Sequence, residues 1–176
     1  MTSSSVLYVM LFQEKQASKY RWLNSILPSV TNLMIGKRII SVKTEKEKVY
    51  LVSDEVFQVF RQMKKHPYSL GFFFAEISEE EVKFSLGVAE KYAKLKRRTV
   101  VASKYGEEKF LYNRNLMKKH VVSCTQDVVE GDLVIVVNQQ GDALGFGRAL
   151  FSATDKVKKE GALVKNLSDR GFFVKH

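Results

Sequence analysis

Two short apolar segments flank a polar turn between residues 131 and 151, and this pattern constrains the fold more than any other. The first segment, Leu133–Val137, is rich in Val and Ile, whose β-branched side chains favour strands. The second, Gly145–Phe151, follows a turn in which Gly141 can adopt a positive φ. The segments therefore predict a β-hairpin of the kind from which small β-barrels are built.

Two glycines in the second segment resemble part of a dinucleotide-binding loop. Such a loop needs a helix directly after its glycines. In this chain Gly145-Phe146-Gly147 is followed by Arg148-Ala149-Leu150-Phe151, which continues as a strand. We therefore interpret the glycines as positions where another backbone approaches closely or where the strand bulges.

The rest of the second half is also predicted to consist mainly of short strands. Asn113 is predicted to cap a short helix over residues 114–120. Several short strands separated by turns indicate a barrel. The predicted strands, besides the hairpin, cover Thr99–Ser103, Lys109–Tyr112, Leu163–Leu167 and Phe172–Lys175.

The first half mixes helices and strands. Helices are predicted over Gln13–Leu27, after Ser53 and over Val88–Leu95, and Pro28 and Pro67 stop the first two. We place a domain boundary after this last helix, which gives the domains 1–93 and 94–176. Strands are predicted over Ile39–Thr44, Lys48–Val52, Leu70–Ile77 and Glu81–Gly87.

The charge balance indicates a polyanionic partner. The chain has a net charge of +10, to which residues 94–176 contribute +7 and residues 1–93 only +3. Such an excess favours nucleic acid first, an acidic membrane second and an acidic protein third. The alternative is that lysines on the surface only keep the protein in solution.

Several classes of site are not indicated by the sequence. The single Cys124 excludes an internal disulfide framework, and His66, His120 and His176 lack the spacing of metal ligands. No phosphate-binding loop or nucleophile elbow is present. The longest apolar runs, such as Val6–Phe12, are far shorter than the roughly 20 residues of a membrane-spanning helix. We expect no enzyme activity, no cofactor, no metal and no membrane association.

Basic and apolar residues alternate near the C-terminus. Lysines and arginines there can contact phosphate, and exposed Phe172 or Phe173 can stack on unpaired bases. The alternative for the two phenylalanines is that they fill the barrel core. The triplet Lys96-Arg97-Arg98 is either a further phosphate contact or a solvated linker. The basic residues of this segment are Lys156, Lys158, Lys159, Lys165, Arg170 and Lys175.

Short motifs in a consistent order give this chain a resemblance to the ribosome-biogenesis factors of the Nip-seven family, over roughly Ser18 to Lys175. The resemblance implies a C-terminal PUA domain, named after pseudouridine synthases and archaeosine transglycosylases, that prefers uridine-rich single-stranded RNA. It also implies a non-catalytic role in large-subunit pre-rRNA maturation and assembly-protein partners on the N-terminal half. The RNA-binding residues that it implies are basic residues near the C-terminus, which in this chain are Lys165, Arg170 and Lys175, with Lys158 and Lys159 adjacent. The motifs are Val49-Tyr50-Leu51-Val52-Ser53, Ser69-Leu70-Gly71, Lys83-Phe84, Leu86, Tyr92-Ala93-Lys94, Phe110-Leu111-Tyr112-Asn113, Leu144-Gly145-Phe146-Gly147, Asp169, Gly171 and Val174-Lys175-His176.

The sequence thus predicts an α+β protein. An N-terminal α/β domain with a mainly antiparallel sheet, residues 1–93, precedes a C-terminal PUA-type β-barrel, residues 94–176. The expected function is binding of pre-rRNA by a monomer, in the cytoplasm of an archaeon or the nucleolus of a eukaryote. The alternatives are a non-catalytic protein adaptor and an accessory subunit of an RNA-modification enzyme.

Overall fold

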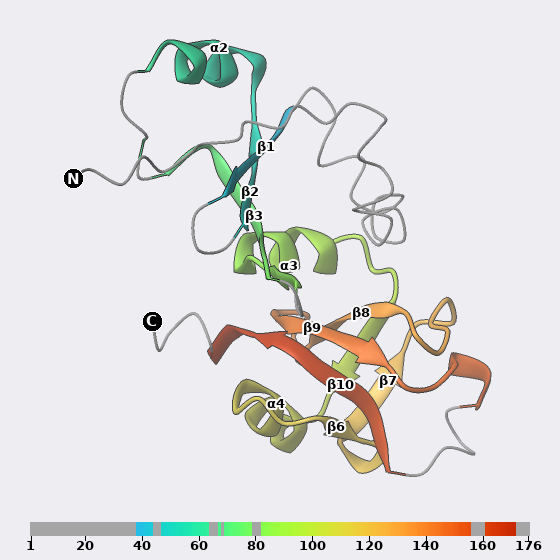
Figure 1. The fold of residues 1–176 in the computed structure, drawn as a ribbon. Coiled ribbons are helices and arrows are strands. Elements are labelled where there is room, and N and C mark those ends of the chain that lie inside the picture. Colours follow the sequence, from blue (N-terminus) through green and yellow to red (C-terminus); the bar gives the residue numbers. More distant parts are fainter. Residues whose placement is uncertain are drawn as a thin grey trace. The chain divides into compact units, whose positions relative to one another are not determined.

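The computed structural model describes residues 38–43, 47–63, 67, 69–78, 82–155 and 161–171. The chain divides into two compact units, Met1–Ser85 and Leu86–His176 (Figure 1). The dividing point lies ahead of the predicted boundary, because the helix α3 (Leu86–Ala93) packs on strands β8 and β9 of the second unit. Which residues form the RNA-binding half stays a prediction.

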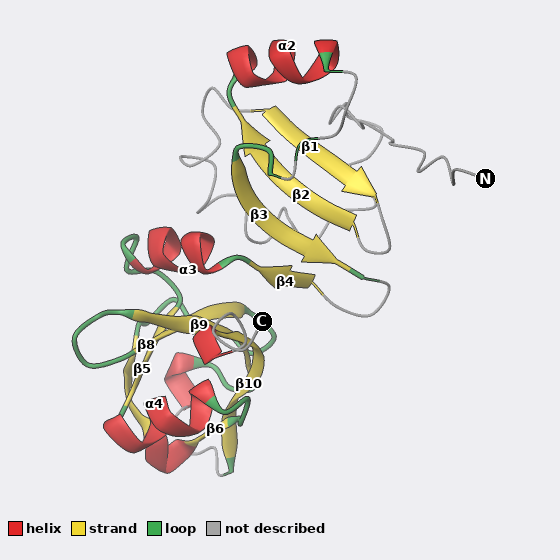
Figure 2. Cartoon of the chain, turned by 90° about the vertical axis from the view of Figure 1, so that its left-hand side faces the viewer, coloured by secondary structure: helices red, strands yellow, loops and turns green. Residues whose placement is uncertain are grey.

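The described part of the first unit contains an antiparallel four-stranded sheet in the order β1-β2-β3-β4. The strands lie side by side in the order in which they occur along the chain (Figure 2), and a helix, α2 (Asp54–Gln62), is inserted between β2 and β3. Near one end of the sheet, Ser41 donates a hydrogen bond to the buried carboxylate of Glu47. The strands are β1 (Arg38–Lys43), β2 (Glu47–Val52), β3 (Phe72–Ile77) and β4 (Val82–Phe84).

The helix α2 (Asp54–Gln62) begins where the sequence predicts it. The hydroxyl of Ser53 accepts a hydrogen bond from the Val56 amide at 3.3 Å, which satisfies a donor of the first turn. Phe57 and Phe60 recur at helical spacing and are buried in the core of the unit. Other apolar residues of the helix and its C-cap, Val56, Val59 and Met63, are exposed.

The second unit is built around a six-stranded sheet in the order β6-β10-β9-β8-β5-β7. Its neighbours are antiparallel except β5 and β8, which run parallel. The two edge strands, β6 and β7, are joined by one turn of 3₁₀ helix, Lys118–His120, so that the sheet curls into a nearly closed barrel. The strands are β5 (Thr99–Ala102), β6 (Leu116–Met117), β7 (Val121–Cys124), β8 (Leu133–Val137), β9 (Ala143–Ala149) and β10 (Ala162–Asp169).

Two helices of the described residues, α3 and α4, pack on the sheet of the second unit. On α3, the buried Tyr92 meets Phe146 of β9 edge to face, with ring centroids 5.8 Å apart. The helix α4 (Lys104–Leu111) is capped by Ser103, whose hydroxyl accepts from the Gly106 amide at 3.1 Å. Its Phe110 joins a core that also contains Val134 and Leu163.

The predicted hairpin is confirmed as β8 and β9, and so is the close approach at its glycines. A Cβ atom at Gly145 would lie 2.0 Å from the carbonyl oxygen of Ser168 on β10. A Cβ atom at Gly147 would lie 2.3 Å from Val164 Cγ1 on the same strand. Strand β10 therefore packs against β9 at a distance that only glycine permits at these two positions.

Two sequence predictions in the second unit are wrong. Residues Lys109–Tyr112 are not a strand, because Ser103 caps a helix that continues to Leu111. Asn113 does not begin a helix over 114–120: its φ is +59°, and its amide donates to Phe110, so it ends α4 instead. The strand β6 and the 3₁₀ turn follow. The predicted helix Gln13–Leu27 and strand Phe172–Lys175 lie outside the described residues.

Candidate nucleic-acid interface

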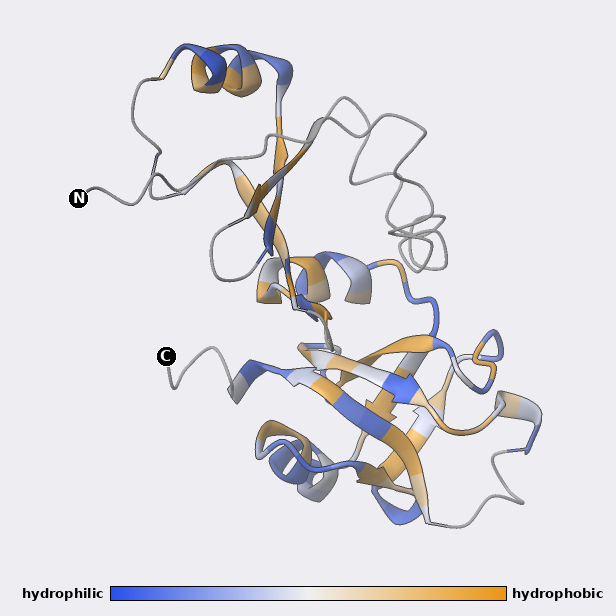
Figure 3. Ribbon diagram, in the orientation of Figure 1, coloured by the Kyte–Doolittle hydropathy of each residue, from blue (hydrophilic) through white to orange (hydrophobic). Residues whose placement is uncertain are grey.

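Two basic residues face each other across neighbouring strands of the barrel. Lys165 of β10 and Arg148 of β9 are partners in the antiparallel register, and both are exposed. Opposed residues of an antiparallel pair project from the same face of the sheet, with Cβ atoms about 4.5–5.5 Å apart. Figure 3 shows hydrophilic stretches that interrupt the otherwise hydrophobic ribbons of β9 and β10.

This pair has no counter-charge in the part of the chain that the structure describes. The ion pairs found there involve other basic residues. Like charges placed directly opposite destabilise a sheet, so the fold gains nothing from holding Lys165 and Arg148 together. Such a pair is suited to bind an external anion, for instance a phosphate group.

Arg170 occupies a different place from Lys165. It follows the end of β10, five residues beyond Lys165, which corresponds to roughly 17 Å along a strand. Its Nη2 lies 3.5 Å from Oε1 of Glu90 on α3, and both side chains are substantially exposed. An exposed pair of this kind is worth less than about 1 kcal/mol, so it leaves Arg170 available to a stronger anion.

Three of the predicted RNA-binding residues, Lys158, Lys159 and Lys175, lie outside the described residues. The same holds for Phe172 and Phe173, so neither the stacking nor the core alternative is decided for them. Arg148 was not among the predicted site residues. The sequence gives little indication of Arg148, because its pairing with Lys165 depends on the register between β9 and β10.

The basic triplet is divided between two roles. Arg97 Nε lies 3.6 Å from Asp127 Oδ2, and Arg98 Nε lies 3.5 Å from Asp132 Oδ2. Burial raises the pKa of Asp127, but hydrogen bonds from Thr125 and the Arg98 amide, with the Arg97 charge, hold it below its usual value. These two arginines therefore anchor the chain ahead of β5. Lys96 instead lines a pocket.

This pocket has a volume of about 620 Å³ and lies within the second unit. Lys94, Lys96 and Arg170 contribute positive charge to its lining, and Glu90 and Asp142 contribute negative charge. Its volume lies in the range of sites for small ligands. In the structure Arg170 therefore lies with Lys94 and Lys96, which follow α3, and not with Lys165.

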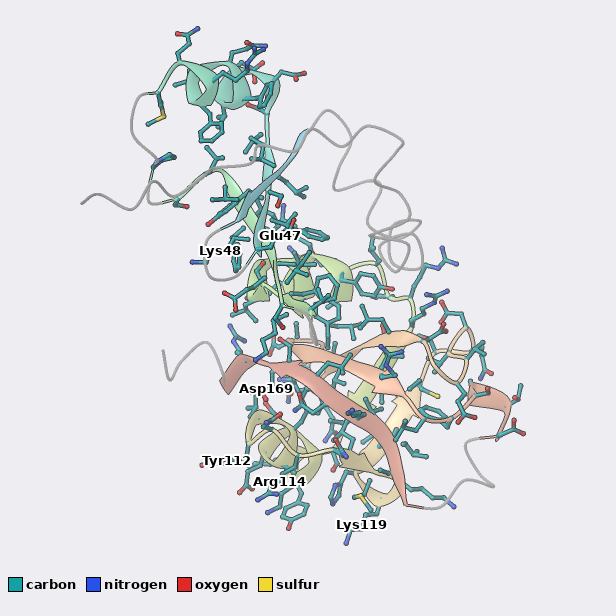
Figure 4. The ribbon with its side chains drawn as sticks, in the orientation of Figure 1. Glu47, Lys48, Tyr112, Arg114, Lys119 and Asp169 are labelled. Carbon is teal, nitrogen blue, oxygen red and sulfur yellow. The ribbon has the colours of Figure 1, made fainter. Side chains whose placement is uncertain are left out.

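Aromatic and basic residues also meet on α4. The Lys109 ammonium lies 4.8 Å above the ring centroid of Tyr105, and the ring of His120 meets Tyr105 edge to face at 5.1 Å. His120 is buried, and neither ring nitrogen has a hydrogen-bond partner among the described residues. Burial, together with the charges of Lys119 and Lys109, lowers the pKa of His120. Figure 4 shows Lys119 projecting from the turn that joins β6 and β7.

The described residues contain no group of His, Cys, Asp and Glu side chains that could hold a metal ion. Among them no helix is long and apolar enough to cross a membrane. Cys124, the last residue of β7, is half-buried and forms no disulfide.

The comparisons with known proteins agree with this architecture. A family model described as the UPF0113 PUA domain matches residues 98–176. A UPF0113 protein of Archaeoglobus fulgidus is 30% identical over 134 residues, which is 75% of each chain. The 60S ribosome subunit biogenesis protein nip7 of Schizosaccharomyces pombe is 27% identical over 108 residues, 60% of this chain and 59% of the relative.

Solved structures show the same fold at lower identity. A conserved PUA domain protein from Thermoplasma acidophilum superposes with a TM-score of 0.63 at 14% identity, over 93% of this chain and 95% of its own. A hypothetical protein from Pyrococcus horikoshii gives a TM-score of 0.63 at 15% identity, over 92% and 94%. The predicted α+β fold with a C-terminal PUA-type barrel is confirmed. The chain belongs to the UPF0113 family and carries that family's PUA domain at its C-terminal end.

Proposed function

We propose that this protein binds single-stranded, uridine-rich RNA through its PUA domain and acts in the biogenesis of the large ribosomal subunit. The observation that carries the proposal is the opposed pair Arg148 and Lys165. Two exposed cations on one face of a sheet supply phosphate contacts at a position where they do not help the fold.

The charge distribution and the relatives support the same function. Residues 94–176 hold +7 of the net charge of +10, and nonspecific affinity for nucleic acid grows with the number of neutralised phosphates. The relative from Schizosaccharomyces pombe is named for 60S subunit biogenesis, which is the process we propose here. The proposed contact residues are Arg148 with Lys165, Arg170, Lys175, Lys158 and Lys159.

The N-terminal domain, residues 1–93, is proposed to contact other assembly proteins. Val59 of α2 and Met63 at its C-cap are 62% and 46% exposed, although both are apolar. Exposed apolar residues at helical spacing are typical of a surface that a partner covers. A purely adaptor function would leave the basic pair on the barrel without a role, so we rank it second.

We propose no catalytic step. The accessory-subunit alternative makes a different prediction. An accessory subunit would bind RNA only together with its catalytic subunit, whereas under the proposed function this chain binds RNA alone.

The test compares two double variants of the full chain that remove equal charge. Arg148→Ala with Lys165→Ala should weaken binding to a uridine decamer by more than about tenfold, a loss of roughly 1.4 kcal/mol. Lys104→Ala with Lys119→Ala removes two other exposed cations of the same unit and should change affinity less than about threefold, roughly 0.7 kcal/mol. Equal losses in both variants would mean that binding follows total charge and that the proposed contact site does not exist.

A further inference from the structure

The pocket of the second unit is lined by residues of different chemistry. The lining includes the apolar residues Val137 and Ala143, which flank the β8–β9 turn. Its lining also includes Gln140, whose amide can both donate and accept hydrogen bonds, and the carboxylate of Asp142. An apolar surface with a few polar groups around it is the usual construction of a ligand site.

The β8–β9 turn that forms one wall is fixed by a single side chain. Asn138 Oδ1 accepts from the amides of Gln140 and Asp142 at 3.0 and 2.8 Å. Asn138 Nδ2 donates to Asp142 Oδ2 at 3.1 Å, and the Gly141 amide donates to the Asn138 carbonyl. The wall is therefore shaped before any ligand arrives, and less entropy is lost when the ligand binds.

Three cations line the pocket, together with the carboxylates of Glu90 and Asp142. Lys94 and Lys96 follow the last turn of α3, and Arg170 follows the end of β10. Lys96 has a φ of +50°, a left-handed conformation that costs a non-glycine residue energy. Arg170 pairs with Glu90 at 3.5 Å in an exposed arrangement, and the three cations outnumber the two carboxylates, which suits the phosphate group of a ligand.

We propose that this pocket takes one unstacked nucleotide of the RNA, a role that rests on the proposed function. Its base lies against Val137 and Ala143 and meets Gln140 and Asp142 with its polar edge. Its phosphate is held by Lys94, Lys96 and Arg170. Single-stranded RNA is recognised in this way, by bases that leave the stack and present their hydrogen-bonding edges.

The pocket and the basic pair lie along the same strand. Ala143, at the pocket, and Arg148, at the basic pair, are five residues apart on β9, a distance of about 17 Å. A segment of a few nucleotides can reach both places. The basic pair then contributes charge-dependent affinity, and the pocket contributes selectivity for a base.

The test uses free ligands, so that it does not depend on RNA binding. The full chain is titrated with the four nucleoside 5′-monophosphates and with ribose 5-phosphate, while amide resonances are followed by NMR. At least one nucleotide should shift the amides of Thr125, Gly141 and Ala143. It should bind at least about fivefold more tightly than ribose 5-phosphate, which lacks the base.

Variants test which residues contact the base and which contact the phosphate of the nucleotide. Gln140→Ala should reduce the affinity for the nucleotide to about that for ribose 5-phosphate. Lys94→Gln with Lys96→Gln should weaken both ligands at least about threefold. The matched control, Lys104→Gln with Lys119→Gln, removes the same charge away from the pocket and should leave both affinities unchanged.

Equal affinity for the nucleotides and ribose 5-phosphate, or shifts that do not centre on the pocket, would overturn the inference. The same protein samples are titrated with a uridine decamer. Decamer binding without nucleotide binding refutes the pocket but leaves the proposed function intact. Nucleotide binding without decamer binding refutes the proposed function, and with it the assignment of the pocket to RNA.

Discussion

Reversing one charge of the opposed pair Arg148 and Lys165 should change the stability of the protein and its RNA affinity in opposite directions. The perturbation is Lys165→Glu, which replaces repulsion across β9 and β10 by attraction. For charged ends about 7 Å apart in water, the Coulomb energy is roughly 0.6 kcal/mol, so reversing one sign changes it by about 1.2 kcal/mol. Screening at physiological salt reduces this, and cross-strand charge pairs contribute about 0.2–1 kcal/mol.

We therefore expect Lys165→Glu to raise the free energy of unfolding by about 0.5–1 kcal/mol. In a unit of this size, a change of 1 kcal/mol raises the melting temperature by roughly 4–8 °C. Thermal denaturation at low and high salt measures the effect, which should shrink as salt screens the pair. RNA affinity should fall, because the variant loses two units of positive charge beside the phosphates.

A double-mutant cycle with Arg148→Ala isolates the pair. In the Arg148→Ala background, Lys165→Glu should no longer stabilise the protein. If Lys165→Glu destabilises the otherwise unchanged chain, or stabilises it equally in both backgrounds, then the two charges do not interact across the strands. Arg148 and Lys165 would then not be a pair that the sheet holds together for an external anion.

Three further predictions concern stability. Gly145→Ala should lower the free energy of unfolding, measured by urea denaturation, by about 2–4 kcal/mol, because the added Cβ would overlap the Ser168 backbone. The control Gly161→Ala should lower it by only about 1 kcal/mol, because Gly161 has a φ of +81° but open space around it. Because the pKa of His120 is lowered in the folded state, the free energy of unfolding should decline as the pH falls below about 6.5, the usual pKa of a histidine. His120→Phe should abolish that part of the decline, and an unchanged pH profile of the variant would contradict this. Ser103→Ala should cost about 1 kcal/mol and Ser103→Asp should restore it, unless the cap of α4 contributes nothing.

The sequence predicted those elements whose signals are local. The β8–β9 hairpin combines β-branched residues with a Gly141 turn, and α2 combines a Ser53 cap with apolar residues at helical spacing. Local signals misled where two propensities compete. Phe110-Leu111-Tyr112 suits a strand, but Ser103 caps the start of α4, and this helix continues through Leu111.

The site was less predictable, because its residues are brought together by register. The charge of Lys165 and its position near the C-terminus indicate a contact residue, but nothing local identifies Arg148 as its neighbour. Asn113 fits the start of a helix as well as the left-handed residue that ends one, and the structure shows the second. Pairing between distant strands and loop conformation decide these positions, and neither is encoded in a short window of sequence.

The parallel pairing of β5 with β8 also determines the order in which the PUA domain can form during synthesis. Thr99 pairs with Ile135, so β5 cannot acquire this neighbour until the chain has grown by more than thirty residues. The last strand, β10, lies between β6 and β9, and until it emerges both present unpaired edges. A nascent chain that ends before Ala162 would thus expose two templates for strand addition, and such a truncated form should aggregate during translation rather than accumulate as a smaller folded domain.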